Sequence, residues 1–336
     1  MQNHKTPAGE VRNWRPAVAG VMVMALLCSL LWTGILAVDI PARQFLVLHT
    51  ALEVASIVIS MLGFGIAWHA YSRERPGNIV MLGVVLFGAG LLDFGHTLSY
   101  AGMPDMVTPS SPGKAIGFWL PARLLVAVGL LAIALRSWQP LRTPHARHGL
   151  MVAVLAFVAL VYWLILARPE LVPDLFVPGQ GLTPFKVRFE YVLVAIYGAA
   201  AALFFYRLCY RSGPQASQVS DIDLFAAAAI AGLSELFFTR YDRVTDLVNA
   251  TGHVYKIVSY YFIYRAVFVN SVRQPFEALH EVLGKEKTRA AEQHSFVRTL
   301  DLLEEAVIEL DTRGRIASAN SSWWLLIGAA PTRESA

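Results

Sequence analysis

Two short stretches of this 336-residue chain carry ionisable side chains at helical spacing inside runs that are otherwise apolar. His49 and Glu53 lie four residues apart in "FLVLHTALEVASIVIS", and Asp93 and His96 lie three residues apart in "LLDFGHTLSY". Residues three or four apart share one face of a helix. Because ionisable groups are expensive in lipid, each pair is expected to face a protein interior, where it can bind a ligand or an ion.

Later apolar runs add further polar residues, and together they form a candidate ligand-binding set. Its members are His49, Glu53, Asp93, His96, Trp119, Arg123, Glu235, His253 and Lys256. A buried carboxylate such as Glu53 needs a partner, which Arg123 or Lys256 can supply. A purely structural network of ion pairs is therefore one alternative to a ligand site. For His49 and His96, a simple hydrogen bond to the backbone at the membrane interface is another.

Three imidazoles in this set also suit a metal ion. His49, His96 and His253 are ligands of the kind that zinc, iron or copper prefer. Glu53 or Asp93 would add a carboxylate to the same ion. A haem held by one or two axial histidines is a further alternative. Nothing in the chain has the specific spacing of an HExxH motif, so the cofactor stays open between a metal ion, a haem and none.

The composition and the length of the apolar runs predict an all-α integral membrane helix bundle. The chain is 56% hydrophobic and 15% charged, whereas a soluble domain carries about a quarter charged residues. Eight apolar runs approach the ~20 residues that a helix needs to cross hydrocarbon. They cover residues 17–38, 45–69, 78–99, 115–136, 149–167, 187–206, 222–239 and 252–272. The expected partner is the lipid bilayer and no nucleic acid is expected; the modest net charge of +4 says nothing about nucleic acid.

The distribution of basic residues predicts the orientation of the bundle. Arginine and lysine are concentrated in the N-terminal segment, residues 1–16, and in the connections after the second, fourth and sixth runs. Such residues favour the cytoplasmic side, so both termini are expected there. The candidate residues then fall in the outer half, which predicts a polar pocket open to the outer face. The cytoplasmic halves are expected to be nearly free of such groups, and Trp119 is expected at the lipid interface first and at a pocket wall second.

The composition changes after residue 272, where the apolar runs end. Residues 273–295 are charged and carry apolar residues at helical spacing, which predicts an amphipathic linker helix able to form a homodimer. In residues 296–336, β-branched residues flank the turn "DTRG". This pattern predicts a β-hairpin followed by a small helix, and so a short cytoplasmic α/β tail.

Four blocks of the sequence resemble a bacterial family of membrane sensors. They are "FLVLHTALEVASIVISMLGFGIAW", "LGVVLFGAGLLDFGHTLSYAGMPD", "FWLPARLL" and "TGHVYKIVSYYFIYRAVF". In this order they resemble the third of the membrane-associated sensor domains, the MASE group, over residues 17–272. The resemblance implies an input module of the bacterial inner membrane, upstream of PAS, histidine-kinase or diguanylate-cyclase modules. The tail "LLEEAVIELDTRGRIASANSSWWLLIG" is similar to the start of a PAS domain, so residues 296–336 are expected to be a truncated one.

Three functions are compatible with these residues. The leading one is a sensory module that detects an unknown small ligand in the outer pocket and signals through the linker to PAS and an output of the histidine kinase or diguanylate cyclase type. The alternative is an intramembrane metal-dependent hydrolase that uses His49, His96 and His253 as ligands and Glu53 or Asp93 as the base. A transporter is the third, and it would need polar groups in the inner half or an inverted repeat.

Overall fold

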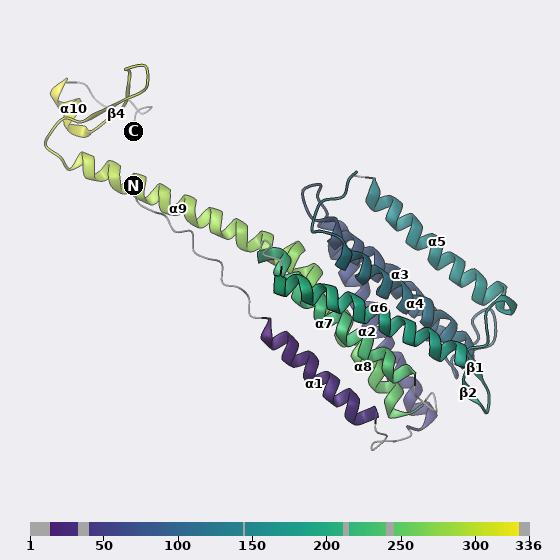
Figure 1. Cartoon of the computed structure of the whole chain (residues 1–336). Coiled ribbons are helices and arrows are strands. Elements are labelled where there is room, and N and C mark those ends of the chain that lie inside the picture. Colours follow the sequence, from purple (N-terminus) through teal and green to yellow (C-terminus); the bar gives the residue numbers. More distant parts are fainter. Residues whose placement is uncertain (1–13, 33–39, 144, 211–214, 240–244, 329–336) are drawn as a thin grey trace. The chain divides into compact units, whose positions relative to one another are not determined.

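The computed structural model describes residues 14–32, 40–143, 145–210, 215–239 and 245–328, most of them helical (Figure 1). It divides into two units, Met1–Gln274 and Pro275–Ala336, which are described separately. The helices of the first unit are α1 (Arg15–Trp32), α2 (Ala42–His69), α3 (Gly77–Ser99), α4 (Pro112–Leu135), α5 (Ala146–Ala167), α6 (Pro184–Tyr210), α7 (Gln215–Phe238) and α8 (Leu247–Phe268). Each of the eight predicted runs therefore overlaps a helix, although the ends differ by several residues, and residues 33–38 of the first run lie outside the described residues.

Five of these helices, α2 to α6, have the length and the apolar composition to cross a membrane, and the shorter helix Arg15–Leu31 is also apolar. The predicted class of an all-α membrane bundle is therefore confirmed in its coarse form. The predicted count of eight spans stays a prediction for the remaining helices.

Six of the helices form a closed ring. In order around the ring, α2 packs on α3, α3 on α4, α4 on α6, α6 on α7, α7 on α8, and α8 on α2. Helix α1 packs outside the ring against α7, and α5 packs outside it against α3 and α4 (Figure 1). One layer of helices therefore separates the interior of the ring from its surroundings, except where α1 and α5 add a second layer.

Helix α2 shows why this interior is polar. Its buried residues recur every three or four positions, as one face of a helix requires. They are Phe45, His49, Glu53, Ser56, Ser60, Gly63 and Ala67. The other face exposes apolar side chains, among them Val47, Val54, Val58 and Leu62. This pattern is the reverse of that in a water-soluble protein, and it fits a helix whose outer surroundings are hydrocarbon.

Glycine allows α2 and α3 to approach each other closely. A Cβ atom added at Gly83 would lie 2.4 Å from the Cβ of Ala67 and 3.4 Å from the Cα of Phe64. The Cα of Phe64 is a backbone atom, and the Cβ of Ala67 is bonded directly to the backbone. Neither atom can therefore rotate away as the end of a long side chain would. Small residues at such crossings are typical of helices that pack in membranes. The close crossing therefore depends on Gly83.

Gly83→Ala is expected to destabilise the bundle by about 1–3 kcal/mol, because the added methyl group overlaps Ala67. Helix propensity alone would favour alanine by about 1 kcal/mol, so the sign of the effect separates packing from propensity. The matched control is Gly65→Ala on the same helix pair, where an added Cβ meets nothing within 4 Å. Thermal melting of the detergent-solubilised chain measures both variants, and equal melting temperatures would contradict the packing explanation.

The connection between α5 and α6 contains short elements that the sequence did not predict. A 3₁₀ turn, η1 (Pro169–Leu171), is followed by the antiparallel strands β1 (Phe176–Val177) and β2 (Gly181–Leu182). Gly179 and Gly181 have φ angles of +79° and +86°, which glycine adopts without strain. This small hairpin packs on α4 at one end of the bundle.

The second unit contains the predicted hairpin and small helix. After α9 (Gln274–Asp301), β3 (Ile308–Leu310) pairs antiparallel with β4 (Ile316–Ala319), and α10 (Ser321–Leu326) follows. In the turn, backbone amides of Arg315 and Arg313 donate to the Asp311 carboxylate, which lowers the pKa of Asp311. Because this pKa is depressed, the stabilisation of the turn is complete at neutral pH and is lost as the pH falls below about 4.

Candidate functional site

The structure buries all nine predicted site residues in the bundle. Each is at most 5% exposed. They come from α2 (His49, Glu53), α3 (Asp93, His96), α4 (Trp119, Arg123), α7 (Glu235) and α8 (His253, Lys256). The helices that supply them are all members of the closed ring, so residues far apart in the sequence share one interior.

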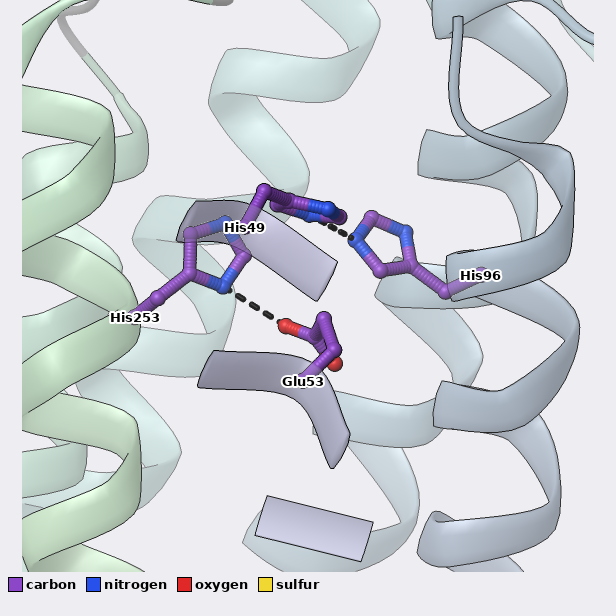
Figure 2. Close-up of side chains that lie close together, drawn as sticks. All are labelled: His49, Glu53, His96 and His253. Carbon is purple, nitrogen blue, oxygen red and sulfur yellow. Dashed lines mark hydrogen bonds and ion pairs between the residues drawn. The ribbon is translucent and has the colours of Figure 1, made fainter. Parts of the chain in front are cut away.

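Three histidines and one glutamate converge from α2, α3 and α8 (Figure 2). Ligand atoms of His49, Glu53, His96 and His253 all lie within 4.8 Å of one another. The Nε2 atoms of His49 and His96 are 3.1 Å apart. His253 Nδ1 lies 2.7 Å from Glu53 Oε1. We call these four residues the histidine cluster.

The backbone of α4 determines which nitrogen of His96 faces the cluster with a lone pair. His96 Nδ1 lies 2.8 Å from the carbonyl oxygen of Ala115. A carbonyl only accepts, so Nδ1 carries the proton and the neutral ring has its lone pair on Nε2. His49 Nε2–H can then donate to that lone pair. The backbone-bonded alternative therefore holds for one nitrogen of His96, while the other nitrogen points into the cluster.

Lys256 holds the carboxylate of Glu53 from the opposite side. Its Nζ lies 2.5 Å from Oε1 and 2.6 Å from Oε2. Both side chains are at most 1% exposed, so each charge depends on the other to offset its desolvation. Lys256 Nζ also lies 3.6 Å from Asp93 Oδ2 and so links the two carboxylates.

Asp93 is paired with Arg123 in the same network. Arg123 Nη2 donates to both oxygens of Asp93, at 2.7 Å and 2.8 Å, and the Tyr260 hydroxyl donates to Oδ2 at 3.4 Å. The guanidinium lies over the rings of Trp119 and Tyr260, 4.6 Å and 5.0 Å from their centroids. Aromatic faces at this distance attract a cation and replace part of its lost hydration.

Trp119 is a wall of the histidine cluster. Its ring centroid lies 5.2 Å from that of His96 and 5.1 Å from that of His253, and the side chain is 3% exposed. The expectation of an interface aromatic first was therefore wrong. Its indole Nε1 has no hydrogen-bond partner among the described residues. A buried donor of this kind calls for a water or a ligand atom.

A cavity of about 30 Å³ adjoins the cluster. Its lining includes His96, Trp119 and His253 together with Lys186 and Glu190. This volume holds a water molecule, whereas sites for organic ligands have roughly 300–1,000 Å³. The packing seen here therefore has room for an ion or for water, and it has no room for a haem at the cluster.

Sequence reasoning missed part of the cavity wall. Lys186 was assigned to an outer loop, but it lies in the first turn of α6, is 1% exposed and pairs with Glu190 Oε1 at 2.7 Å. Its ammonium also donates to the carbonyl oxygen of Phe238. The spacing of four residues between Lys186 and Glu190 was the available signal, because such pairs face each other on a helix.

A comparison with family models assigns this chain to a family. A model described as a membrane-associated sensor domain, MASE3, matches residues 40–275, more than two thirds of the 336-residue chain. The chain belongs to the MASE3 family of membrane-associated sensor domains. The match begins after α1, later than the predicted start at residue 17, and it includes the whole histidine cluster. No curated protein and no solved structure gave a match.

Glu235 is the one predicted residue that stands apart in this MASE3 domain. It is 1% exposed on α7, and its Oε2 has no hydrogen-bond partner among the described residues. It is not one of the four residues whose ligand atoms converge in the histidine cluster. A buried carboxylate oxygen without a hydrogen bond is unusual and calls for a water or a ligand atom.

The MASE3 bundle has a second layer of buried ion pairs, at the other ends of its helices. Arg207 Nε lies 3.3 Å from Asp221 Oδ2, and Trp138 Nε1 donates to Asp221 Oδ1 at 3.0 Å. Arg265 Nε lies 3.0 Å from both carboxylate oxygens of Asp223. The expectation that the helix halves opposite the site would be nearly free of such groups was therefore wrong. Arg207 and Asp221 fell just outside the predicted spans, whereas Asp223 and Arg265 fell inside them and were overlooked.

A π-helical segment, η2 (Val269–Arg273), follows α8 directly in this MASE3 domain. Arg75 reaches it from the connection between α2 and α3. Its Nη1 donates to the carbonyl oxygen of Ser271 at 3.1 Å and to that of Ala70 at 3.0 Å. π-Helical turns leave backbone carbonyls with altered partners and occur often at functional positions. The end of α8 is therefore tied to the end of α2.

Proposed function

We propose that this MASE3 domain detects a signal in the pocket formed by the histidine cluster and its adjoining cavity. The observation that carries the proposal is the convergence of three imidazoles and a carboxylate inside a bundle whose outer faces are apolar. Ionisable groups are costly to bury in a membrane protein and usually mark a binding site or an ion path. A ligand bound there would act by binding one packing arrangement of the helices more tightly than another.

In the proposed topology, α1 to α8 each cross the bacterial inner membrane and both termini are cytoplasmic. The apolar lengths of α2 to α6 support it, as do the basic residues in the N-terminal segment and after α2, α4 and α6. His49 and Glu53 then lie early in a helix that enters from outside, and Asp93 and His96 lie late in one that leaves there. The pocket would therefore be close to the outer face.

The signal would leave through α8. His253 and Lys256 belong to this helix, and the chain stays helical from Leu247 through η2 to Asp301. A shift of α8 would then act on the PAS-like tail and on an output of the histidine kinase or diguanylate cyclase type. The exposed apolar residues of α9 support a homodimer through this linker. They are Phe276, Leu279, Val282 and Leu283.

The size of the cavity weighs against the hydrolase alternative. A lipid ester or amide needs a cleft beside the metal and the base, and the cavity at the cluster has about 30 Å³. Both carboxylates that could act as the base are also held on both oxygens, Glu53 by Lys256 and Asp93 by Arg123. A general base must instead be free to accept a proton from the attacking water.

His96→Ala is expected to abolish the response of the domain while its insertion into the membrane stays intact. The test fuses the whole chain to a complete output domain and measures output while external pH, divalent metal ions and small ligands are varied. The matched control is His69→Ala, which removes an exposed histidine at the far end of α2 and should respond as the unmodified fusion does. A normal response of His96→Ala to every condition that activates the unmodified fusion would refute the pocket.

A further inference from the structure

We propose that the histidine cluster binds a divalent first-row transition metal ion, of which Zn²⁺ is the best match, in competition with Lys256. This inference names the ligand of the proposed sensory pocket and so rests on the proposed function. When the ion is absent, the ammonium of Lys256 takes its place by pairing with the carboxylate of Glu53.

The positions of the donor atoms support a metal site. Four donors within 4.8 Å of one another come from three different helices. Zinc bonds of about 2.1 Å in a tetrahedron place neighbouring donors roughly 3.4 Å apart. The pairs at 3.1 Å (His49 and His96) and 2.7 Å (His253 and Glu53) are already at or below this spacing. Rotation of side chains within the cluster therefore suffices to close the site, without movement of a helix.

The chemistry of the donors selects the class of ion. Imidazole nitrogen with one carboxylate oxygen suits zinc, iron(II), copper(II) or nickel(II), whereas calcium and magnesium need oxygen ligands and copper(I) prefers sulfur. His96 also has the outer partner that bound histidines usually have, since its Nδ1–H donates to the Ala115 carbonyl at 2.8 Å. The adjoining cavity of about 30 Å³ leaves space for one water on the ion.

The balance of buried charge favours a cation at this end of the bundle. Four carboxyl groups are buried here, from Glu53, Asp93, Glu190 and Glu235, against three basic side chains, from Arg123, Lys186 and Lys256. An anionic ligand would add to the excess of acidic groups. A metal ion would instead meet the carboxylate of Glu53 directly.

The competition follows from the double role of Glu53. Lys256 Nζ lies 2.5 Å and 2.6 Å from its two oxygens, so a metal that takes an oxygen brings a double positive charge close to the ammonium. Two cations at such a distance repel strongly where water is excluded. Asp93 Oδ2, 3.6 Å from Nζ, offers the displaced ammonium a second anion. Metal binding is therefore coupled to a shift of Lys256 toward α3.

This exchange of partners would change the neighbouring helix with which Lys256 of α8 is paired. His253 and Lys256 lie three residues apart on α8 and therefore on one face of that helix. With the metal absent, both hold Glu53 of α2. With the metal bound, His253 becomes a ligand while Lys256 turns to Asp93 of α3. The two states thus differ in which neighbour α8 is tied to, which is the kind of difference that can move a helix.

The test titrates Co²⁺, which has visible absorption bands, and then Zn²⁺ into the whole chain after purification in detergent and removal of metals by a chelator. One equivalent of Co²⁺ is expected, with the intense bands of a four-coordinate site and displacement by Zn²⁺. His96→Gln and His253→Gln should weaken binding at least about 100-fold. His280→Ala, at an exposed position of α9, should bind as the unmodified chain does. Lys256→Met should tighten binding at least about tenfold, because it removes the competing charge.

Two outcomes would overturn the metal site. One is the absence of stoichiometric binding to the unmodified chain, which needs no variant to fold. The other is binding that the His96 and His253 substitutions leave unchanged. If Lys256→Met weakens binding, the site stands but the competition is wrong. None of these binding measurements depends on an output domain, so they are independent of the fusion assay. If the chain binds no metal but the fusion still loses its response with His96→Ala, the metal site is refuted and the proposed pocket remains.

Discussion

Replacing Glu53 with glutamine is expected to abolish the response of the sensor and to lower its stability by about 3–5 kcal/mol. The substitution preserves the size of the side chain but removes the charge that both oxygens share with Lys256. Lys256 is 1% exposed, so its buried ammonium would lose both short contacts and keep only the longer one to Asp93 Oδ2, at 3.6 Å. Thermal melting of the purified chain measures the loss of stability, and the output of the fusion measures the response.

The double variant Glu53→Gln with Lys256→Met separates stability from signalling. Removing both charges leaves neither group unpaired, so most of the lost stability should return, and the two substitutions should be strongly non-additive. The response should stay absent, because the carboxylate that the pocket needs is still missing. A double variant that responds normally would show that the pair has a structural role alone.

Asp93→Asn is expected to be the second large effect, again a loss of about 3–5 kcal/mol. It removes the anion that accepts two hydrogen bonds from Arg123 Nη2, at 2.7 Å and 2.8 Å. Arg123 would keep the aromatic faces of Trp119 and Tyr260, which compensate for only part of a lost ion pair. The melting temperature of the purified chain is the measurement.

An exposed ion pair in the same chain provides the control for this prediction. Glu281 pairs with Lys285 at 2.6 Å on α9, and both side chains are 67% exposed. Glu281→Gln should leave the melting temperature almost unchanged, because solvent screens the pair. If Asp93→Asn and Glu281→Gln shift the melting temperature equally, then burial does not determine the value of the Asp93 pair and the interpretation of the network is wrong.

Helical spacing located the candidate residues but could not assign their partners. The spacings of His49 with Glu53 and of Asp93 with His96 correctly placed each pair on one buried face. Which carboxylate a buried cation chooses depends on which helices are neighbours. Because α8 packs on α2, Lys256 pairs with Glu53. No local pattern in the sequence encodes that neighbourhood.

The ends of the helices were harder to predict than their middles. Apolar runs report where hydrocarbon surrounds a helix, and the helices continue beyond that region into polar surroundings. Lys186 and Arg207, near the two ends of α6, were therefore assigned to loops although both are buried. The same effect hid the ion pair of Asp221 with Arg207. Asp223 and Arg265 lie inside predicted runs, so hydropathy alone failed to show that they pair. Burial of a charge at a helix end depends on tertiary contacts that hydropathy does not measure.

Between the two polar ends of the ring, the helices carry no ionisable side chain over long stretches. Residues 79–92 of α3, 124–135 of α4 and 224–233 of α7 are all apolar or glycine. At 1.5 Å per residue, the stretch of α3 alone is about 21 Å long. In the proposed topology, a voltage across the bilayer would fall mainly over this middle, where these stretches offer protons and ions no charged side chain. A change at one polar end would then reach the other as a displacement of helices rather than as a flow of charge.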